Sequence, residues 1–329
     1  MKRRRRFLQT LAGSLLAVLS PARAQAPERL FRIGYLNPAT AQDPGHAFAV
    51  LRSALAGLGY VNGRNIAYEE RWADGKLAKL DGFAAELVAS RVDLIVAVSP
   101  SAIRAAQKAT TTLPIVMAFS GDDPVKSGFV ASLAHPGTNI TGMTALTSAV
   151  APKWIELLLD AVPSAKRVAV LRSPDRADHD DHVEIIRAAA QRYQVQIHTV
   201  SAKDLGQYPA AFDEMSRQKD QAVIILSGPE FAQNLGPLAS LALTHRLPSL
   251  WQYREFAVAG GLLAYGPDIQ DLSAAAAVFV DKILKGAKPA DLPVQQPTKF
   301  VLAINLKTAG VLGLAIPRDL MVRADDVIR

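Results

Sequence analysis

Short apolar runs alternate with amphipathic stretches along most of the sequence, and this order constrains the fold more than any other feature. In the first half it predicts strands at 31–36, 65–71, 92–98 and 114–119, separated by helices at 44–58 and 77–90 and by a helix ending at 108. A strand followed by a helix returns to the sheet in the same direction. The first half therefore predicts an α/β domain with a parallel sheet.

The same order starts again in the second half. Helices are predicted at 154–160, 182–193, 208–218 and 234–245, with strands at 167–171, 195–200, 222–226 and 248–251. A later helix at 272–284 and a strand at 300–305 are interpreted as returns to each domain. We expect residues 30–143 plus 266–297 to form an N-terminal lobe, and 144–265 plus 298–329 to form a C-terminal lobe. A chain of 329 residues suits two domains of this size.

The first 24 residues have the pattern of a cleaved export signal. Basic residues at 2–6 precede an apolar run at about 8–19, and Ala22-Arg23-Ala24 fits a cleavage site. The apolar run is too short to span a bilayer comfortably. Arg4-Arg5 followed by Phe7-Leu8 resembles the twin-arginine pattern. Twin-arginine export, general secretory export and an uncleaved anchor stay open, and either export route leads to the periplasm.

The net charge of +7 comes mostly from this leader, which holds six of the 37 basic residues and no acid. The remaining 31 basic residues face 30 acidic ones, so the sequence gives no support for nucleic-acid binding. The chain has no cysteine, which excludes disulfides, thiolate zinc sites and cysteine nucleophiles. It has neither a P-loop nor a G-x-S-x-G elbow, and the glycines at 57–63 do not have the dinucleotide spacing.

Several motifs, taken in their order, carry a family resemblance. They include RIGYL at 32–36, LGYVNGRNI at 58–66, AHPGTNITG at 134–142, YGPD at 265–268, QPTKF at 296–300 and RADDVI at 323–328. Together they resemble the substrate-binding proteins of an ABC-transporter family that includes tryptophan- and tyrosine-transporter types. The resemblance implies a type I periplasmic-binding-protein fold, in which two Rossmann-like parallel-sheet lobes are joined by three crossings and enclose the ligand.

Ligands of open parallel sheets lie beyond the carboxyl ends of the strands, which selects the candidate residues of the first lobe. The hydroxyls of Ser99 and Ser101, with the amides of the following helix, suit a carboxylate, or simply cap that helix. Four further positions complete the candidates: Asn37 as an amide contact, Phe119 as a stacking ring, and Ser120 or Asp123 as partners of an ammonium group. The alternatives are a core phenylalanine and a solvated turn.

Candidates of the second lobe follow the same rule. Arg172 suits a carboxylate or lies on the surface, and Ser173, Ser227 and Gly228 offer hydroxyl or backbone contacts. Three aromatic residues near the second crossing, Trp251, Tyr253 and Tyr265, either line the ligand site or pack within the lobes. Asp268, which follows them, either binds an amine or caps a helix.

An acidic and histidine-rich stretch supports a rival hypothesis. Its members are Asp175, Asp178, His179, Asp180, Asp181 and His182, and the two histidines share one helix face. Imidazole and carboxylate groups can hold a divalent metal, so a periplasmic metal-binding protein or hydrolase is the alternative function. The simpler interpretation is an acidic, solvated helix start.

These observations together favour an exported solute receptor rather than an enzyme. We expect a monomer without a cofactor that binds a small carboxylated solute between its lobes. An amino acid, aromatic or branched, is favoured over other organic acids. The expected partner is an ABC permease in the inner membrane, and closure of the two lobes on the ligand is the expected mechanism.

Overall fold

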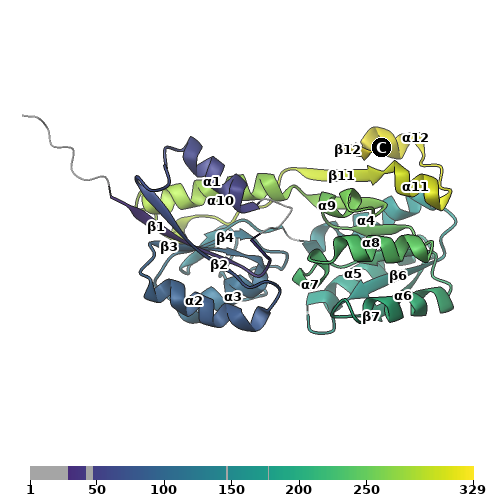
Figure 1. Cartoon of the computed structure of the whole chain (residues 1–329), viewed down its shortest axis with the longest axis horizontal. Coiled ribbons are helices and arrows are strands. Elements are labelled where there is room, and N and C mark those ends of the chain that lie inside the picture. The colour runs from purple at the N-terminus through teal and green to yellow at the C-terminus, as the bar shows by residue number, and fades with distance from the viewer. Residues whose placement is uncertain (1–28, 42–46, 146, 177) are drawn as a thin grey trace, which may run out of the picture.

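Two β-sheets, one in each half of the molecule, place two α/β lobes side by side in the computed structural model (Figure 1). It describes residues 29–41, 47–145, 147–176 and 178–329. The expected leader at 1–24 lies outside the described residues. Within the described part of the chain, no helix is long and apolar enough to cross a membrane.

The sheet of the first lobe has the strand order β2-β1-β3-β4-β5 and is parallel throughout. Its strands are β1 (Phe31–Asn37), β2 (Ile66–Trp72), β3 (Leu94–Val98), β4 (Ile115–Phe119) and β5 (Ile140–Gly142). Helices α2 (Leu80–Ala89) and α3 (Ser99–Ala109) cover one face. The other face is covered by α1 (Ala47–Gly57) together with α10 (Ile269–Leu284), which returns from the last third of the chain.

The sheet of the second lobe has the order β12-β11-β10-β9-β8-β6-β7. The strands are β6 (Arg167–Arg172), β7 (Gln196–Ser201), β8 (Ala222–Ile225), β9 (Ser249–Trp251), β10 (Leu263–Pro267), β11 (Phe300–Asn305) and β12 (Asp326–Ile328). One face packs on α4 (Thr147–Ala161), α5 (Asp178–Gln191), α11 (Leu306–Leu312) and α12 (Arg318–Arg323). The other packs on α6 (Tyr208–Arg217), α7 (Pro229–Ala232), α8 (Leu235–Thr244) and α9 (Arg254–Val258).

The fold class predicted from the alternating pattern is confirmed, with one local difference. β11 runs antiparallel to β10, whereas every other described strand pair is parallel. The chain leaves the second lobe at the end of β10, forms α10 in the first lobe and then returns. It therefore enters β11 at the edge of the sheet where β10 ends, and runs back along it. The direction of β11 thus follows from the path between the lobes rather than from its own residues.

Three segments connect the lobes, and hydrogen bonds join them to one another. The amide of Thr144, after β5, donates to Gln295 O at 2.9 Å, and the Gln295 amide donates to Gly142 O at 2.9 Å. The ammonium of Lys299 lies 2.8 Å from the carboxylate of Asp268, which links the second connection to the third. The connecting segments therefore form one bonded group on one side of the molecule.

Candidate functional site

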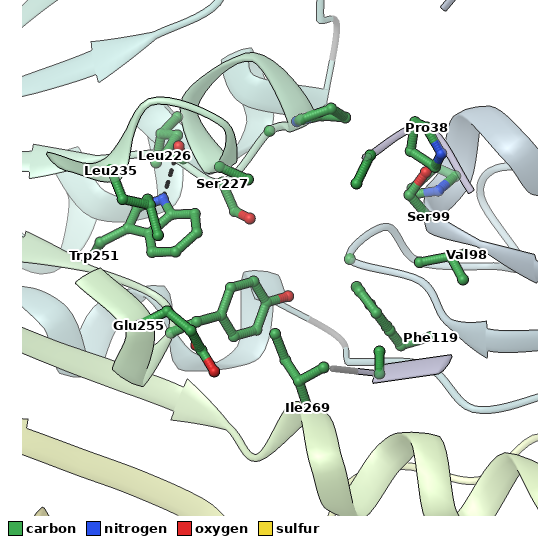
Figure 2. Close-up of a pocket in the computed structure, with 18 of the residues that line it drawn as sticks. Pro38, Val98, Ser99, Phe119, Leu226, Ser227, Leu235, Trp251, Glu255 and Ile269 are labelled. Atoms are coloured by element: carbon green, nitrogen blue, oxygen red, sulfur yellow. Dashed lines mark hydrogen bonds between the residues drawn. The ribbon is translucent and has the colours of Figure 1, made fainter. Parts of the chain in front are cut away.

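A cavity lies between the two lobes, at the carboxyl ends of strands from both sheets (Figure 2). The first lobe contributes Pro38, Val98, Ser99 and Phe119, and the second contributes Leu226, Ser227, Leu235 and Trp251. The volume of the cavity is about 130 Å³.

The wall from the first lobe carries three of the expected residues. Ser99 begins α3 in a left-handed conformation, with φ of 76°, that serine rarely adopts. Its hydroxyl lies 3.0 Å from that of Ser101. Asn37 is buried at the end of β1, where its Nδ2 donates to Tyr35 Oη at 3.1 Å and its Oδ1 accepts from the Ala39 amide at 2.9 Å. Phe119 ends β4 and faces the cavity in Figure 2.

The wall from the second lobe includes the aromatic side chains of Trp251 and Tyr253. Nε1 of Trp251 donates to Leu226 O at 3.3 Å, which fixes the indole plane against the end of β8. The ring of Tyr253 meets Trp251 edge-on, with 5.3 Å between their centroids. Burial raises the pKa of Tyr253 well above its usual value, so its hydroxyl stays protonated. The Tyr253 ring also lies 6.3 Å from that of Phe119, so aromatic side chains meet across the cavity.

Lining residues that were not expected from the sequence include Trp154, Arg176, Leu235 and Glu255. Arg176 lies three residues beyond the expected pair Arg172 and Ser173, in the same loop after β6. The signal that could have found it is a charged side chain in a loop after a strand, further along the loop than the residues expected there. Trp154 is within α4, where its Nε1 donates to Tyr265 O at 2.8 Å, and a buried helix residue gives no such signal.

Four expected residues have other partners outside the cavity lining of the described structure. Ser101 lines a separate shallow groove between α2 and α3. Ser120 is fully buried, and its hydroxyl donates to Asp122 O at 3.4 Å. Asp123 accepts at Oδ1 from the amides of Val125 and Lys126, at 2.9 and 3.3 Å. Arg172 donates to Ser201 Oγ at 3.2 Å and to Asp180 Oδ1 at 2.5 Å.

The remaining expected residues support the lobes. Tyr265, within β10, stacks on Phe300 of β11 with 6.0 Å between centroids. Asp268 caps α10 by accepting from the amides of Gln270 and Asp271, at 2.9 and 3.2 Å. Burial would raise the pKa of Asp268, but the bond from Lys299 and the two amides lower it below its usual value. Ligand contact by any expected residue stays a prediction.

Within the histidine-rich stretch, His182 lines the cavity, whereas His179 joins two loops of the second lobe. The Ser173 amide donates to Nδ1 of His179 at 3.0 Å, so Nε2 carries the proton and donates to Ser227 O at 3.0 Å. The ring stacks on Phe231, with 10° between planes. Both ring nitrogens of His179 are therefore used within the lobe. Among the described residues, no three His, Asp or Glu side chains are placed to hold a metal.

Comparisons with known proteins show which family this two-lobed protein belongs to. Residues 46–328 match the family described as "ABC transporter substrate binding protein". The chain belongs to this family. Its members bind solutes outside the cytoplasm as components of ABC transporters and are not enzymes. This confirms the resemblance seen in the sequence and removes the hydrolase alternative.

Relatives of the binding protein share most of its length. An ABC domain in complex with L-Trp from Streptococcus pneumonia is 26 % identical, with a TM-score of 0.83 over 91 % of this chain and 99 % of that one. A protein named "Tyrosine-binding protein" from Clostridioides difficile (strain R20291) is 25 % identical over 79 % of this chain and 74 % of its own length. A ligand-free, open substrate binding protein from Clostridium difficile, at 21 % identity and a TM-score of 0.69, shares the fold.

Proposed function

We propose that the binding protein takes up an aromatic amino acid between its lobes. The observation that carries the proposal is the aromatic lining, in which Phe119 of one lobe faces Trp251 and Tyr253 of the other. Aromatic walls bury a large ring area and favour edge-on or offset contacts with a ring. Two relatives, one named for tyrosine and one in complex with L-Trp, support the same ligand class.

The polar groups of the lining suit the two ends of an amino acid. Ser99 and the first amides of α3 offer hydrogen bonds and a favourable dipole to a carboxylate. Glu255, which is half-buried, brings a negative charge to the opposite wall, where an ammonium group would be favoured. The ring would lie between Phe119 and Trp251. A branched amino acid fills less of this space, and an acid without an ammonium group gains nothing from Glu255.

The proposal includes the route and the partner that the sequence predicts. The leader at 1–24 would direct export to the periplasm by the twin-arginine pathway, with cleavage after Ala24. The mature monomer would close on its ligand, with 30–143 plus 266–297 moving against 144–265 plus 298–329 as two bodies. It would then deliver the ligand to an ABC permease in the inner membrane, without a cofactor and without binding nucleic acid.

A thermal-shift and calorimetric screen of residues 25–329 tests the ligand. L-tryptophan and L-tyrosine should raise Tm by mass action, whereas L-leucine and indole-3-propionate should have smaller effects. The variant Phe119→Ala should weaken binding about tenfold, because a ring contact contributes roughly 1–1.5 kcal/mol. Phe83→Ala, which removes a partly buried ring on the outer helix α2, is the matched control and should leave affinity unchanged.

Two results would contradict this function. One is the absence of any shift with aromatic amino acids while a sugar or a plain organic acid stabilises the protein. The other is equal loss of affinity in Phe119→Ala and Phe83→Ala, which would separate binding from the aromatic lining.

A further inference from the structure

Charged side chains of the two lobes meet beside the aromatic walls. Nη2 of Arg176, in the loop after β6, lies 3.6 Å from Oδ1 of Asp122, in the loop after β4. Each side chain is only 15 % exposed. Because β4 and β6 belong to different sheets, this ion pair exists only at a small separation of the lobes.

Asp122 is anchored to its own lobe while it reaches the other. The hydroxyl of Ser127 donates to Oδ2 of Asp122 at 3.5 Å. The backbone carbonyl oxygen of Asp122 accepts from Ser120 Oγ at 3.4 Å and from Thr144 Oγ1 at 3.3 Å. Thr144 follows β5 and begins the first connection between the lobes. The position of Oδ1 is therefore fixed by the first lobe, and Arg176 meets it only when the second lobe approaches.

Two further contacts show that the lobes are closed to this separation. The Phe119 and Tyr253 rings lie 6.3 Å apart, edge to face. A Cβ built on Gly75, after β2, would lie 2.5 Å from Oε1 of Gln233, after α7, so the backbone of one lobe touches a side chain of the other. The ion pair is thus one of several contacts that join the two lobes in this closed arrangement.

The charges of the pair depend on each other in the closed state. Opposite charges at this separation attract more strongly when water is largely excluded than when both are solvated. If one charge is removed, the other stays largely buried without its counter-charge, which disfavours closure. If both charges are removed, no buried charge is left without its counter-charge, and closure is not disfavoured in this way. Single and double substitutions should therefore have different effects on the same equilibrium.

We propose that Asp122 is a positioning residue that acts through Arg176 to hold the lobes closed. It sets the lifetime of the bound state by fixing the separation at which the aromatic walls face each other. The effect on closure needs no knowledge of the ligand. The effect on ligand release rests on the proposed function.

Distances between the lobes in the ligand-free protein test the first effect. The chain has no cysteine, so spin labels at Ala85→Cys in α2 and Arg217→Cys in α6 report one distance by pulsed electron paramagnetic resonance. Both positions are exposed, and Figure 1 shows both helices at the side of the molecule away from the connecting segments. Asp122→Asn should move the distribution to longer distances, and the double variant Asp122→Asn/Arg176→Gln should move it back towards wild type.

The control is Asp326→Asn, which removes a pair of 2.5 Å with Arg254 inside the second lobe. It should leave the distances unchanged. A wild-type distribution that Asp122→Asn leaves unaltered would overturn the proposal, and so would a double variant more open than either single variant.

Stopped-flow binding of L-tryptophan and L-tyrosine tests the second effect. Asp122→Asn should raise the dissociation rate about fivefold, with little change in the association rate, and Asp122→Glu should restore most of the loss. Equal changes in both rates would count against a closure role. If the wild-type protein binds neither amino acid, the proposed function fails, and the ligand-free distances still decide the role of Asp122.

Discussion

Replacing His179 by alanine should destabilise the second lobe more than any exposed histidine change. His179 is 1 % exposed and connects the loop after β6 to the loop after β8. It accepts from the Ser173 amide and donates to the Ser227 carbonyl, each at 3.0 Å. Its ring also packs parallel to Phe231. The second of these loops lines the cavity, so the site depends on the same side chain.

The magnitude follows from the groups that alanine would leave behind. The Ser173 amide is buried, and losing its acceptor costs about 2 kcal/mol. The Ser227 carbonyl is partly exposed, which reduces its share to about 1 kcal/mol. Lost packing of the ring on Phe231 adds about 1 kcal/mol. The free energy of unfolding should therefore fall by about 4 kcal/mol, and Tm by roughly 6 °C for a chain of this size.

Calorimetry and urea unfolding of the mature protein measure this effect. His179→Asn places an oxygen near the position of Nδ1 and keeps an acceptor for Ser173, so it should lose about half as much. His135→Ala, at an exposed turn, is the control and should change stability by less than about 0.5 kcal/mol. A His179→Ala protein as stable as the control would refute the reasoning. Stoichiometric zinc binding lost in that variant would instead revive the metal hypothesis.

Three smaller perturbations have equally definite expectations. Because the pKa of Asp268 is lowered in the folded protein, its charge stabilises the fold above the usual aspartate pKa, and this stabilisation is lost as pH falls. In urea unfolding, Asp268→Asn should therefore be less stable than wild type at pH 7 and nearly as stable as wild type at pH 2.5. Burial and a hydrogen bond to a carboxylate on α10 raise the pKa of Tyr60 to about 12, so stability should fall between pH 10 and 12 in wild type and less steeply in Tyr60→Phe. Gly142→Ala would place its Cβ 2.3 Å from a backbone carbonyl of β4 and should lower Tm by several degrees, whereas Gly82→Ala in α2, with nothing within 4 Å, should raise it slightly.

The sequence predicted the sheets well because buried parallel strands have continuous apolar runs. The runs at 94–98 and 222–225 are fully buried in β3 and β8. The direction of β11 could not be predicted from the sequence, because its six residues do not indicate from which lobe the chain arrives. Short elements such as β5 and β12, of three residues each, have too few positions to show a period.

The candidate residues that line the cavity lie at or just after a strand end, but Arg172 and Ser120 also lie there and have other partners. Asn37, Phe119 and Trp251 each end a strand and line the cavity. Tyr265, in the middle of β10, packs on the neighbouring strand instead. Arg176 lies deeper in a loop, where its approach to the cavity depends on the other lobe and on Asp122. Contacts between lobes are set by how two folded bodies meet, and no local pattern records that.

The packing of α10 on α1 has a consequence for how the protein is made. Residues 269–284 cover a face of the sheet that is formed by residues 31–142. While the ribosome is still adding the first 268 residues, that apolar face is covered by α1 alone, and the second sheet still lacks β11 and β12. Neither lobe can then complete its core during most of synthesis. A nascent chain of this kind stays available to chaperones until nearly its last residues, and the first 143 residues expressed alone should aggregate rather than fold.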